Sequence, residues 1–455
     1  MFKRQLLLEL ENWRQNKHRK PLVIRGARQV GKTTLVNQFA TKYEQYIYVN
    51  LELAEDKEPF ENFTTIEHLI NTLFFLKNKT ITKKSSTLLF IDEIQEVPTA
   101  LNTLRYFYER APEISIIAAG SMLETLFDKN ISFPIGRVEY KVIRPVSFPE
   151  FLLAMGETTA LEEITKVPIA AYAHTKLLSL FHTYALIGGM PEIVQHYATH
   201  KDLVSLAPIY DSLISGYMDD VEKYAKSNAQ ILHIRHCIQS SFAQAGKRIK
   251  FEGFGNSAYK SREMGESLRI LEKALLLQLI YPCTSATLPM IPEIKKSPKL
   301  QILDTGLLNY FVGIQKEIIG TNDLNSIYQG TLIEHLIGQE ILAFQNNALS
   351  ALHFWVREKK ESTAEVDYLF QIDGQIIPIE VKSGKEGSLK SLHSFMDLAP
   401  HDKAIRFYAG ALNITDAITQ NGKQYQILNL PYYLGSQIEN YITWFIQTKK
   451  PARKS

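Results

Sequence analysis

The chain is poor in cysteine and has no long apolar segment. Its 455 residues include two cysteines, Cys237 and Cys283, too few for a disulfide framework or a cysteine-rich zinc site. A reducing, cytoplasmic compartment is therefore expected. The longest apolar runs, such as residues 274–277, fall far short of the ~18 residues of a transmembrane helix, so no membrane association is predicted.

Net charge is also small. Lys and Arg number 51 and Asp and Glu 48, a difference of 51 − 48 = +3. This balance excludes a polycation that binds nucleic acid by charge alone, so any DNA contact must come from local patches. Hydrophobic residues make up 45% and charged residues 22%, which indicates a soluble globular protein. At ~150 residues per domain, the length predicts about three domains.

The N-terminus superficially resembles a secretory signal, because Lys3 and Arg4 precede three leucines. Glu9 and Glu11 interrupt that apolar run almost at once, so secretion is not expected. The helical spacing of leucines in this segment instead predicts an amphipathic helix over residues 7–16.

Between residues 20 and 147, strand-like apolar runs alternate with helical patterns. The predicted strands are residues 22–24, 47–50, 88–91, 114–118 and 140–143. Strands that alternate with helices indicate a parallel sheet covered by helices on both faces. The fold class predicted for this part is therefore α/β.

A phosphate-binding loop connects the first predicted strand to the helix that follows it. Residues 26–33 fit the pattern G-x-x-x-x-G-K-[ST], in which backbone N–H groups and a helix N-terminus face phosphates. Lys32 is expected to reach the β- and γ-phosphates, and Thr33 to bind Mg²⁺. ATP and Mg²⁺ are thus the predicted cofactors. The predicted nucleotide-binding residues are Gly26, Ala27, Arg28, Gln29, Val30, Gly31, Lys32, Thr33 and Thr34.

Two carboxylates follow another predicted strand. Asp92 and Glu93 end the run Thr87–Ile91, which is entirely apolar after its first residue. Asp92 is expected to hold the Mg²⁺ shell, and Glu93 to polarise the attacking water.

Two further polar residues are candidates for the same site. Ser121 follows the strand that ends near Gly120, where it is either a γ-phosphate contact or an ordinary turn serine. Arg137 immediately precedes the fifth strand. In this layout the sequence resembles AAA+ ATPases, whose arginine finger lies just before that strand and acts on the ATP of a neighbouring subunit. The resemblance implies a homo-oligomer, and a solvated surface arginine is the alternative for Arg137.

The middle of the chain adds two motifs. Gly188-Gly189-Met190-Pro191 interrupts a helical region, and Asp304 and Gly306 lie in the run Lys-Leu-Gln-Ile-Leu-Asp-Thr-Gly-Leu-Leu. With the phosphate loop, they resemble a prokaryotic family of predicted AAA+ ATPases that carry a C-terminal domain of unknown function. A bend between lid helices is the simplest role for the paired glycines.

That resemblance divides the chain into four parts. They are an ATPase core (1–150), a helical lid (151–226), a winged-helix-like segment (227–300) and a C-terminal domain (301–455). In the third part, a turn over residues 257–264 and a long amphipathic helix over 268–280 are expected. Basic residues near that turn could meet DNA phosphates, or the segment could bind protein instead. They are Lys247, Arg248, Lys250, Lys260 and Arg262.

Near the C-terminus, Asp373-Gly374 predicts a two-residue hairpin. Ile372 then pairs with Gln375, and the same register places Asp367 opposite Glu380, with about 5 Å between Cβ atoms. Lys382 projects from the same face two residues further on. Facing carboxylates repel each other, and a bound Mg²⁺ would remove that repulsion.

This layout resembles the PD-(D/E)XK nuclease superfamily, in which two acids bind Mg²⁺ and the lysine orients or activates water. The superfamily adds a glutamate on a preceding helix, which Glu334 matches; Glu340, near the centre of that helix's apolar stripe, is a second candidate. The resemblance implies metal at Glu334, Asp367 and Glu380 and catalysis by Asp367, Glu380 and Lys382.

The sequence therefore predicts an ATP-hydrolysing AAA+ module that controls DNA binding, or metal-dependent DNA cleavage, by a restriction-endonuclease-like α/β domain. The alternative is a nucleotide-dependent signalling switch. Its C-terminal domain would be catalytically inactive and would recognise a partner protein or nucleic acid.

Overall fold

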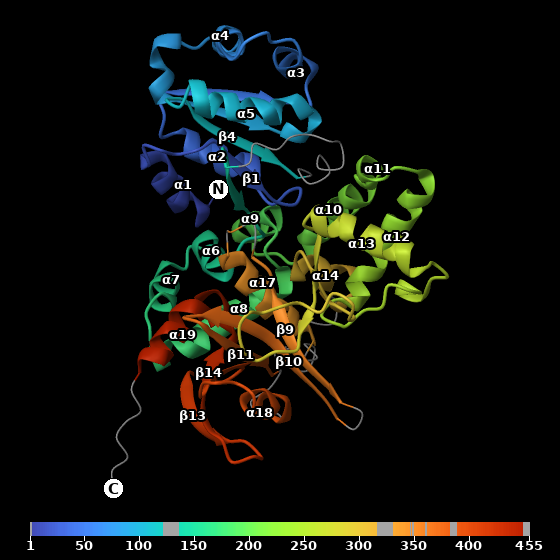
Figure 1. The fold of residues 1–455 in the computed structure, drawn as a ribbon. Helices are drawn as coiled ribbons and strands as arrows, with labels where there is room; N and C mark the ends of the chain where they lie inside the picture. Colours follow the sequence, from blue (N-terminus) through green and yellow to red (C-terminus); the bar gives the residue numbers. More distant parts are fainter. Residues whose placement is uncertain are drawn as a thin grey trace.

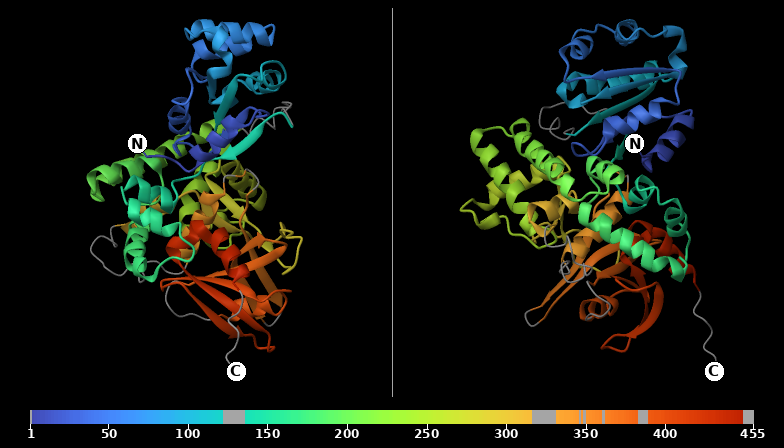
Figure 2. Two further views of the ribbon diagram at one scale, coloured as in Figure 1. Left: turned by 90° about the vertical axis from the view of Figure 1, so that its left-hand side faces the viewer. Right: turned by 180° about the vertical axis from the view of Figure 1, so that it is seen from behind.

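The computed structural model describes residues 2–121, 136–315, 331–345, 347, 350–359, 362–382 and 389–448. The N-terminal part forms one end of the molecule and the C-terminal sheet the other, with the middle helices between them (Figures 1 and 2). No helix among the described residues is long and apolar enough to cross a membrane.

A five-stranded parallel sheet forms the N-terminal lobe. Its strand order is β2-β3-β4-β1-β5, and β1 pairs with β4 on one side and with β5 on the other. All five strands predicted from the sequence are present. They are β1 (Leu22–Arg25), β2 (Gln45–Asn50), β3 (Thr87–Asp92), β4 (Ser115–Gly120) and β5 (Glu139–Val142).

Helices cover both faces of this sheet, as the alternation of strands and helices predicts. Val23 packs in a cluster with α3, α4 and α5, whereas Leu22 and Ile24 pack in the opposite cluster with α1 and α2. Successive strand residues point to opposite faces, so a strand buried on both sides must be apolar throughout. The helices are α1 (Leu6–Gln15), α2 (Lys32–Ala40), α3 (Ala54–Glu61), α4 (Ile66–Leu76) and α5 (Pro98–Arg110).

The middle of the chain is helical, as predicted, and turns sharply at the paired glycines. Gly188 has φ +74°, and a Cβ atom there would overlap Asp304 and Gly306. The backbone N–H of Gly189 donates to Asp304 Oδ2 at 2.6 Å, so the two sequence motifs meet in space. The helices are α6 (Phe148–Ala154), α7 (Thr158–Ile164), α8 (His174–Ile187), α9 (Pro191–His200), α10 (Ala207–Asp219) and α11 (Val221–Tyr224).

The next segment differs in part from its prediction. Helix α12 (Asn228–Gln244) is followed by α13 (Ser261–Lys273), which is shorter than the helix expected to reach Ile280. Leu275 has φ +59°, which ends the helix, and β6 (Leu277–Ile280) then pairs antiparallel with β8 (Lys299–Ile302). After β8, α14 occupies Thr305–Phe311.

The C-terminal region contains a seven-stranded mixed sheet in the order β13-β14-β12-β11-β10-β9-β7. The hairpin predicted at Asp373-Gly374 is formed by β10 and β11 in the middle of this sheet. The strands are β7 (Pro282–Cys283), β9 (His353–Lys359), β10 (Ser362–Ile372), β11 (Gln375–Val381), β12 (Lys403–Tyr408), β13 (Asn413–Ile418) and β14 (Gln424–Pro431). The helices are α17 (Thr331–Phe344), α18 (Lys390–Met396) and α19 (Ile438–Gln447).

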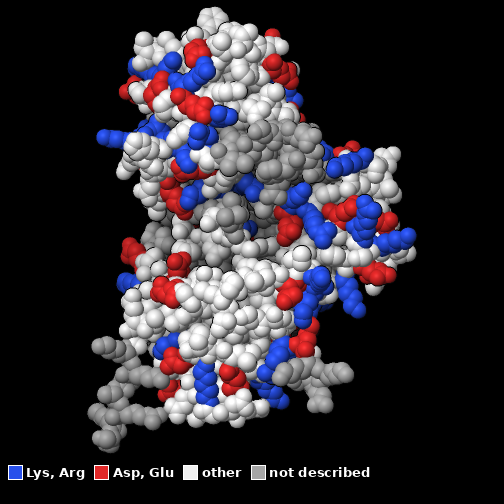
Figure 3. All heavy atoms as spheres, viewed as in Figure 1, with Lys and Arg blue, Asp and Glu red and all other residues white. Residues whose placement is uncertain are grey.

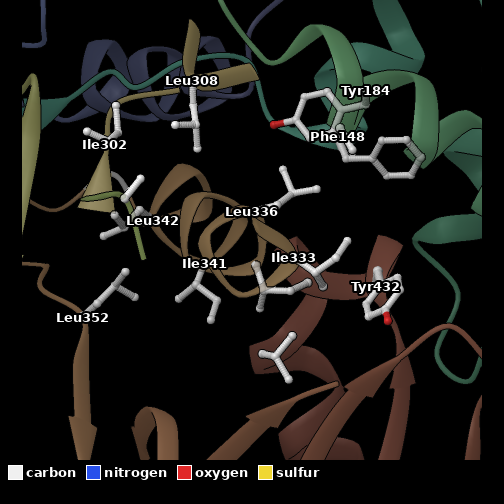
Figure 4. Close-up of a cluster of buried hydrophobic side chains, with 14 of the residues drawn as sticks. Phe148, Tyr184, Ile302, Leu308, Ile333, Leu336, Ile341, Leu342, Leu352 and Tyr432 are labelled. Atoms are coloured by element: carbon white, nitrogen blue, oxygen red, sulfur yellow. The ribbon is translucent and has the colours of Figure 1, made fainter. Parts of the chain in front are cut away.

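Helix α17 lies at the centre of the largest hydrophobic cluster. Figure 4 shows its leucine and isoleucine side chains among residues of α6, α8, β8, α14 and the segment after β14. The cluster includes residues from Val146 to Phe445, and it is continuous in space between the middle helices and the C-terminal sheet. The middle helices and the C-terminal region thus share one core, while the N-terminal sheet has two of its own.

Candidate functional site

The phosphate-binding loop lies between the carboxyl end of β1 and the start of α2. Gly31 has φ +93°, a conformation that suits glycine, and forms the N-cap of α2. A Cβ atom on Gly26 would lie 2.7 Å from Ile143 O, so the loop also requires a glycine there. Lys32 Nζ donates to the carbonyl oxygens of Gly26 (3.0 Å) and Ala27 (2.9 Å). Burial lowers the pKa of Lys32.

The two carboxylates after β3 lie beside this loop. Thr33 Oγ1 donates to Asp92 Oδ2 at 2.7 Å, which joins two of the predicted metal ligands. Burial raises the pKa of Asp92, although the bond from Thr33 works against this. Glu93 has φ +49° and accepts a hydrogen bond from Gln95 Nε2. A non-glycine residue in this region of φ is uncommon and is enriched at functional sites.

The loop opens into a cavity of about 710 Å³ that reaches beyond the N-terminal lobe. Glu93, which follows β3, lines it together with six residues from the loop and the start of α2: Arg28, Gln29, Gly31, Lys32, Thr33 and Thr34. The start of α9 also lines it, through Pro191 of the paired-glycine motif and Glu192 beside it. The motif therefore faces the phosphate loop, a contact that the sequence did not predict.

Arg4 is another lining residue that the sequence analysis missed. Its guanidinium donates to Val30 O at 3.0 Å and to Arg144 O at 2.6 Å, and it pairs with Glu150 at 3.0 Å. Arg4 thus ties the phosphate loop to the end of β5 and to α6. The basic N-terminal segment gave no sequence signal for this role.

Arg28 extends the loop toward the middle helices. Its guanidinium forms an ion pair with Asp220, which follows α10, and another with Glu52 at 3.4 Å. Tyr217 of α10 donates its hydroxyl to Arg28 O at 3.0 Å. The phosphate loop is therefore in direct contact with the region predicted as the lid.

Ser121 and Arg137 occupy different ends of the sheet. Ser121 is buried and follows β4. It lies at the carboxyl ends of the strands, as the phosphate loop does, since Gly120 is in register with Arg25. Arg137 precedes β5 and so lies at the amino-terminal ends of the strands, opposite the phosphate loop. There it forms an ion pair with Glu109 at 3.1 Å, and its guanidinium lies over the Tyr108 ring. Because β5 is parallel to β1, Arg137 lies away from the phosphate loop of its own chain.

A second group of charged residues lies on the C-terminal sheet. β10 and β11 pair from Ile372–Gln375 to Tyr368–Ile379, the predicted hairpin register, which ends one pair before Asp367 and Glu380. Asp367 Oδ2 instead accepts a hydrogen bond from Val381 N at 2.7 Å. Lys382 forms an ion pair with Glu380.

Lys299 of β8 brings further carboxylates into this group. Its ammonium lies 2.6 Å from Glu334 Oε1, 2.7 Å from Glu365 Oε1 and 3.8 Å from Asp367 Oδ1, and its side chain is 5% exposed. We call Lys299, Glu334, Glu365, Asp367, Glu380 and Lys382 the carboxylate cluster. Sequence reasoning missed Lys299 and Glu365, because Lys299 comes from a distant strand.

Burial controls protonation in the carboxylate cluster. Desolvation and the nearby Asp367 charge raise the pKa of both Glu334 and Glu380 to about 8. Burial disfavours the charged form of Lys299, but Glu334, Asp367 and Glu365 outweigh it and raise the pKa of the ammonium. Glu380 Oε2 is buried without a hydrogen-bond partner. Within the described residues, no group of three His, Cys, Asp or Glu side chains is arranged to hold a metal ion.

Glu340, the second candidate for the helix glutamate, lies elsewhere on α17. It is 0% exposed, and its carboxylate accepts hydrogen bonds from Phe148 N at 3.1 Å and Tyr184 Oη at 2.6 Å. Gln339 beside it donates to Tyr184 Oη and to Asp304 Oδ2. Glu340 therefore joins α17 to α6 and α8, and only Glu334 of the two contacts the carboxylate cluster.

The parallel strand order, the phosphate loop and the Asp-Glu pair after β3 together define a P-loop ATPase domain. Residues 18–152 match a family model described as an AAA domain, which supports the assignment of this part of the chain as an ATPase domain. Residues 178–318 match a domain of unknown function (DUF8612), and residues 329–433 match another (DUF4143).

No curated protein matches the chain. A solved structure described as the Walker-type ATPase PABY2304 of Pyrococcus abyssi is 14% identical, with a TM-score of 0.45; the alignment covers 69% of this chain and 96% of that chain.

Proposed function

We propose that the protein hydrolyses ATP in a Mg²⁺-dependent reaction and that its nucleotide state controls its C-terminal domain, whose target is DNA. The observation that carries the ATPase proposal is the hydrogen bond from Thr33 to Asp92 beside the phosphate loop. It brings together a hydroxyl and a carboxylate, the oxygen ligands that Mg²⁺ prefers with nucleotide phosphates.

Each residue of the ATP site has a distinct proposed role. Lys32 leaves the carbonyl oxygens of Gly26 and Ala27 for the β- and γ-phosphates, which are stronger acceptors for an ammonium. Thr33 and Asp92 hold Mg²⁺, which neutralises phosphate charge. Glu93 accepts a hydrogen bond from the attacking water and orients it. Ser121 contacts the γ-phosphate from the neighbouring strand.

Arg137 is proposed to act on another subunit's nucleotide. Arg137 lies at the amino-terminal ends of the strands, too far away to reach the ATP of its own chain. Its guanidinium is about half exposed. A homo-oligomer would supply this charge to a neighbouring site.

The ATPase proposal is tested with purified protein, ATP and Mg²⁺. Lys32→Ala should abolish nucleotide binding, and Glu93→Gln should retain binding but reduce hydrolysis by 100-fold or more. Lys83→Ala, which removes an exposed lysine of the same lobe, is the control and should change neither. If Lys32→Ala hydrolysed ATP as fast as the parent, the proposal would be wrong.

DNA contact is proposed for residues 227–300, which resemble a winged helix. The support is the order α12, α13, β6, β8, together with an antiparallel bridge between Arg248 and Lys299 that adds a third short strand position. Of the basic residues near the turn, Arg248 is paired with Glu358 at 2.9 Å and Arg262 with Glu266 at 3.0 Å. DNA phosphates would have to replace these carboxylate partners.

For the C-terminal domain, cleavage is the first candidate activity. Asp367 accepts a hydrogen bond from Val381 N, next to Glu380 and its partner Lys382, and Lys299 joins Asp367 to Glu334 of α17; the nuclease superfamily that the segment resembles uses residues of these types. In that role Glu334, Asp367 and Glu380 would have to rearrange to hold Mg²⁺, because in the structure they are not arranged as a metal site. Lys382 positions the water that hydrolyses a phosphodiester to a phosphate monoester and a hydroxyl.

The inactive recognition module is the second candidate, and Lys299 favours it. An internal ammonium already neutralises the carboxylates that would otherwise attract a metal ion, and burial favours protonated Glu334 and Glu380. Incubation with DNA, ATP and Mg²⁺ or Mn²⁺ distinguishes the two. Cleavage that Asp367→Ala abolishes while ATP hydrolysis continues supports the nuclease; ATP hydrolysis without cleavage of any DNA form supports the switch.

A further inference from the structure

A second large cavity lies where the N-terminal lobe, the segment with α13 and helix α17 meet. Its volume is about 460 Å³, within the range of small-molecule sites. Arg25 and Arg144 line it from the ends of β1 and β5, Arg269 and Lys273 from α13, and Leu342 from α17. On the face drawn in Figure 3, Lys and Arg atoms border the hollow below the upper lobe.

The charged residues of this cavity are nearly all basic. Its lining contains three arginines and one lysine, and Glu272 is the one carboxylate among the described lining residues. Glu272 Oε1 already accepts a hydrogen bond from Leu279 N at 2.8 Å. Cationic side chains therefore outnumber the carboxylate in the described lining by four to one.

Arg144 is the most unusual of these residues. Its Nε atom is buried and has no hydrogen-bond partner, and no described carboxylate forms an ion pair with its guanidinium. Desolvation, followed by the like charge of Arg25, lowers the pKa of Arg144 to about 10. The residue as a whole is half-buried, and a cationic group whose buried Nε lacks an acceptor is costly to desolvate, a cost that a bound anion would offset.

The rest of the wall indicates what the anion carries. Val142, Leu275, Leu277, Ile302 and Leu342 make much of the lining apolar. A bare inorganic ion would make no contact with these side chains. A ligand with an apolar or aromatic body would cover them while its anionic group meets the guanidinium groups, whose planar donors suit phosphate.

We propose that this cavity binds a small organic phosphate, with the phosphate at Arg144 and Arg25 and the apolar body against the leucines of β6 and α17. The site is separate from the ATP site and does not depend on the roles proposed there. It lies close to that site in the structure, because Arg25 directly precedes Gly26 in the chain. Arg4 also joins Arg144 O to Val30 O of the phosphate loop.

The test measures binding in a protein whose ATP site is disabled. Lys32→Ala protein is titrated with three probes by calorimetry and thermal denaturation: AMP, which combines a phosphate with an aromatic body, adenosine, which lacks the phosphate, and inorganic phosphate. AMP should bind at one site per chain, at least tenfold more tightly than either of the others.

Variants locate that site. Arg144→Gln in the Lys32→Ala background should weaken AMP binding at least tenfold, and Arg269→Gln, at the opposite wall, should weaken it as well. Arg262→Gln, which removes the same charge from an exposed position of α13, should bind AMP as the parent does. Without AMP, Arg144→Gln should melt no lower than its parent, because it removes a cationic group whose buried Nε has no hydrogen-bond partner.

Two results would overturn the proposal. One is the absence of saturable AMP binding to folded Lys32→Ala protein. The other is AMP binding that Arg144→Gln and Arg269→Gln leave unchanged, which would place the nucleotide elsewhere. If Arg144→Gln lowered the melting temperature without weakening AMP binding, Arg144 would be a structural residue and the proposal would equally be wrong.

Discussion

Among single residues, Lys299 determines the state of the carboxylate cluster. Its ammonium contacts Glu334 and Glu365 within hydrogen-bond distance, and the pair with Asp367 is longer, at 3.8 Å. A lysine in this position provides one positive charge where a metal ion would provide two. The cluster is therefore held together without a metal, and any metal must compete with Lys299.

Lys299→Met tests this competition. Removing one partner of a buried ion pair leaves uncompensated carboxylates, which should cost about 3–5 kcal/mol of unfolding free energy. Mn²⁺ should then raise the melting temperature of the variant more than that of the parent, because the metal replaces the lost charge. Differential scanning fluorimetry with and without Mn²⁺ measures both effects.

The control for this variant is Lys296→Met, which removes a lysine paired with Glu358 at the rim. The free energy of unfolding of this control should fall by less than about 1 kcal/mol, and Mn²⁺ should raise its melting temperature no more than that of the parent. Equal stabilisation of parent and Lys299→Met by Mn²⁺ would show that Lys299 does not compete with the metal.

Arg4 has a comparable role at the ATP cavity. Its side chain is 9% exposed and joins Val30, Arg144 and Glu150. Arg4→Met should destabilise the phosphate loop and raise the dissociation constant of a fluorescent ATP analogue about tenfold, since two or more charge-assisted hydrogen bonds are lost. Arg14→Met, at the end of the neighbouring helix α1, should leave the affinity within about twofold of the parent. An unchanged affinity in Arg4→Met would contradict this assignment.

At the scale of secondary-structure elements, the turn between α8 and α9 depends on the start of α14. Asp304 accepts hydrogen bonds from Gly189 N at 2.6 Å and from Leu307 N at 3.0 Å, so one buried carboxylate holds the turn and caps α14. Gly306 packs directly against the Ile187 carbonyl, where a Cβ atom would overlap the backbone. The two elements can approach this closely only with glycines on both sides.

Gly306→Ala should therefore destabilise the protein by more than about 3 kcal/mol, measured by urea denaturation, because the overlapping atom is backbone and cannot move aside. Gly216→Ala in α10 is the matched control, because nothing lies within 4 Å of its Cβ position. Alanine favours the helix more than glycine does, so this variant should have a free energy of unfolding about 0.5–1 kcal/mol higher than the parent. A Gly306→Ala protein as stable as the parent would show that the contact between the two motifs is dispensable.

At the scale of the whole molecule, the shared core encloses several carboxyl groups. Burial raises the pKa of Asp304 to about 6 and that of Glu340 to about 7, in addition to the raised values in the carboxylate cluster. A carboxyl group with a raised folded-state pKa binds a proton in the folded chain more readily than in the unfolded chain. Its stabilising effect is complete at low pH and is lost as the pH rises through the folded-state value.

These carboxyl groups make the free energy of unfolding fall as the pH rises from about 5 to about 8. Burial lowers the pKa of His335 to about 3, and this acts in the opposite direction up to the ordinary histidine value of about 6.5, so a net fall is expected between about pH 6.5 and pH 8. Each such group contributes a slope of up to about 1.4 kcal/mol per pH unit within its own window. Glu340→Gln should make the slope shallower between about pH 5 and 7, while Glu439→Gln, at an exposed position of α19, should not.

The measurement is urea denaturation followed by tryptophan fluorescence in a Trp13→Phe background. Of the three tryptophans, this leaves Trp355 and Trp444, both in the C-terminal region, as reporters. Stability that stayed constant or rose between about pH 6.5 and pH 8 would contradict the assignment of buried, proton-binding carboxyl groups.

The amino-acid sequence by itself determined the features that depend on local pattern. The five strands of the N-terminal sheet, the phosphate loop with Lys32 and Thr33, the pair Asp92 and Glu93, and the hairpin at Asp373-Gly374 all follow from residue type and spacing, because the interactions that define them are close in the chain. The division of the chain at residues 150, 226 and 300 stays a prediction. Residues 122–135 and 316–330 lie outside the described part of the structure.

Only the tertiary structure decided which distant segments meet. Lys299 enters the carboxylate cluster from a strand far from the hairpin, Arg4 reaches the phosphate loop from the first residues, and the start of α9 lines the ATP cavity. The sequence offers Glu334 as the match to the nuclease glutamate and Glu340 as a second candidate, and only their packing shows that Glu334 contacts the carboxylate cluster and Glu340 does not. Contacts of this kind form because buried charges must find partners wherever the folded chain places them, and no local pattern records that choice.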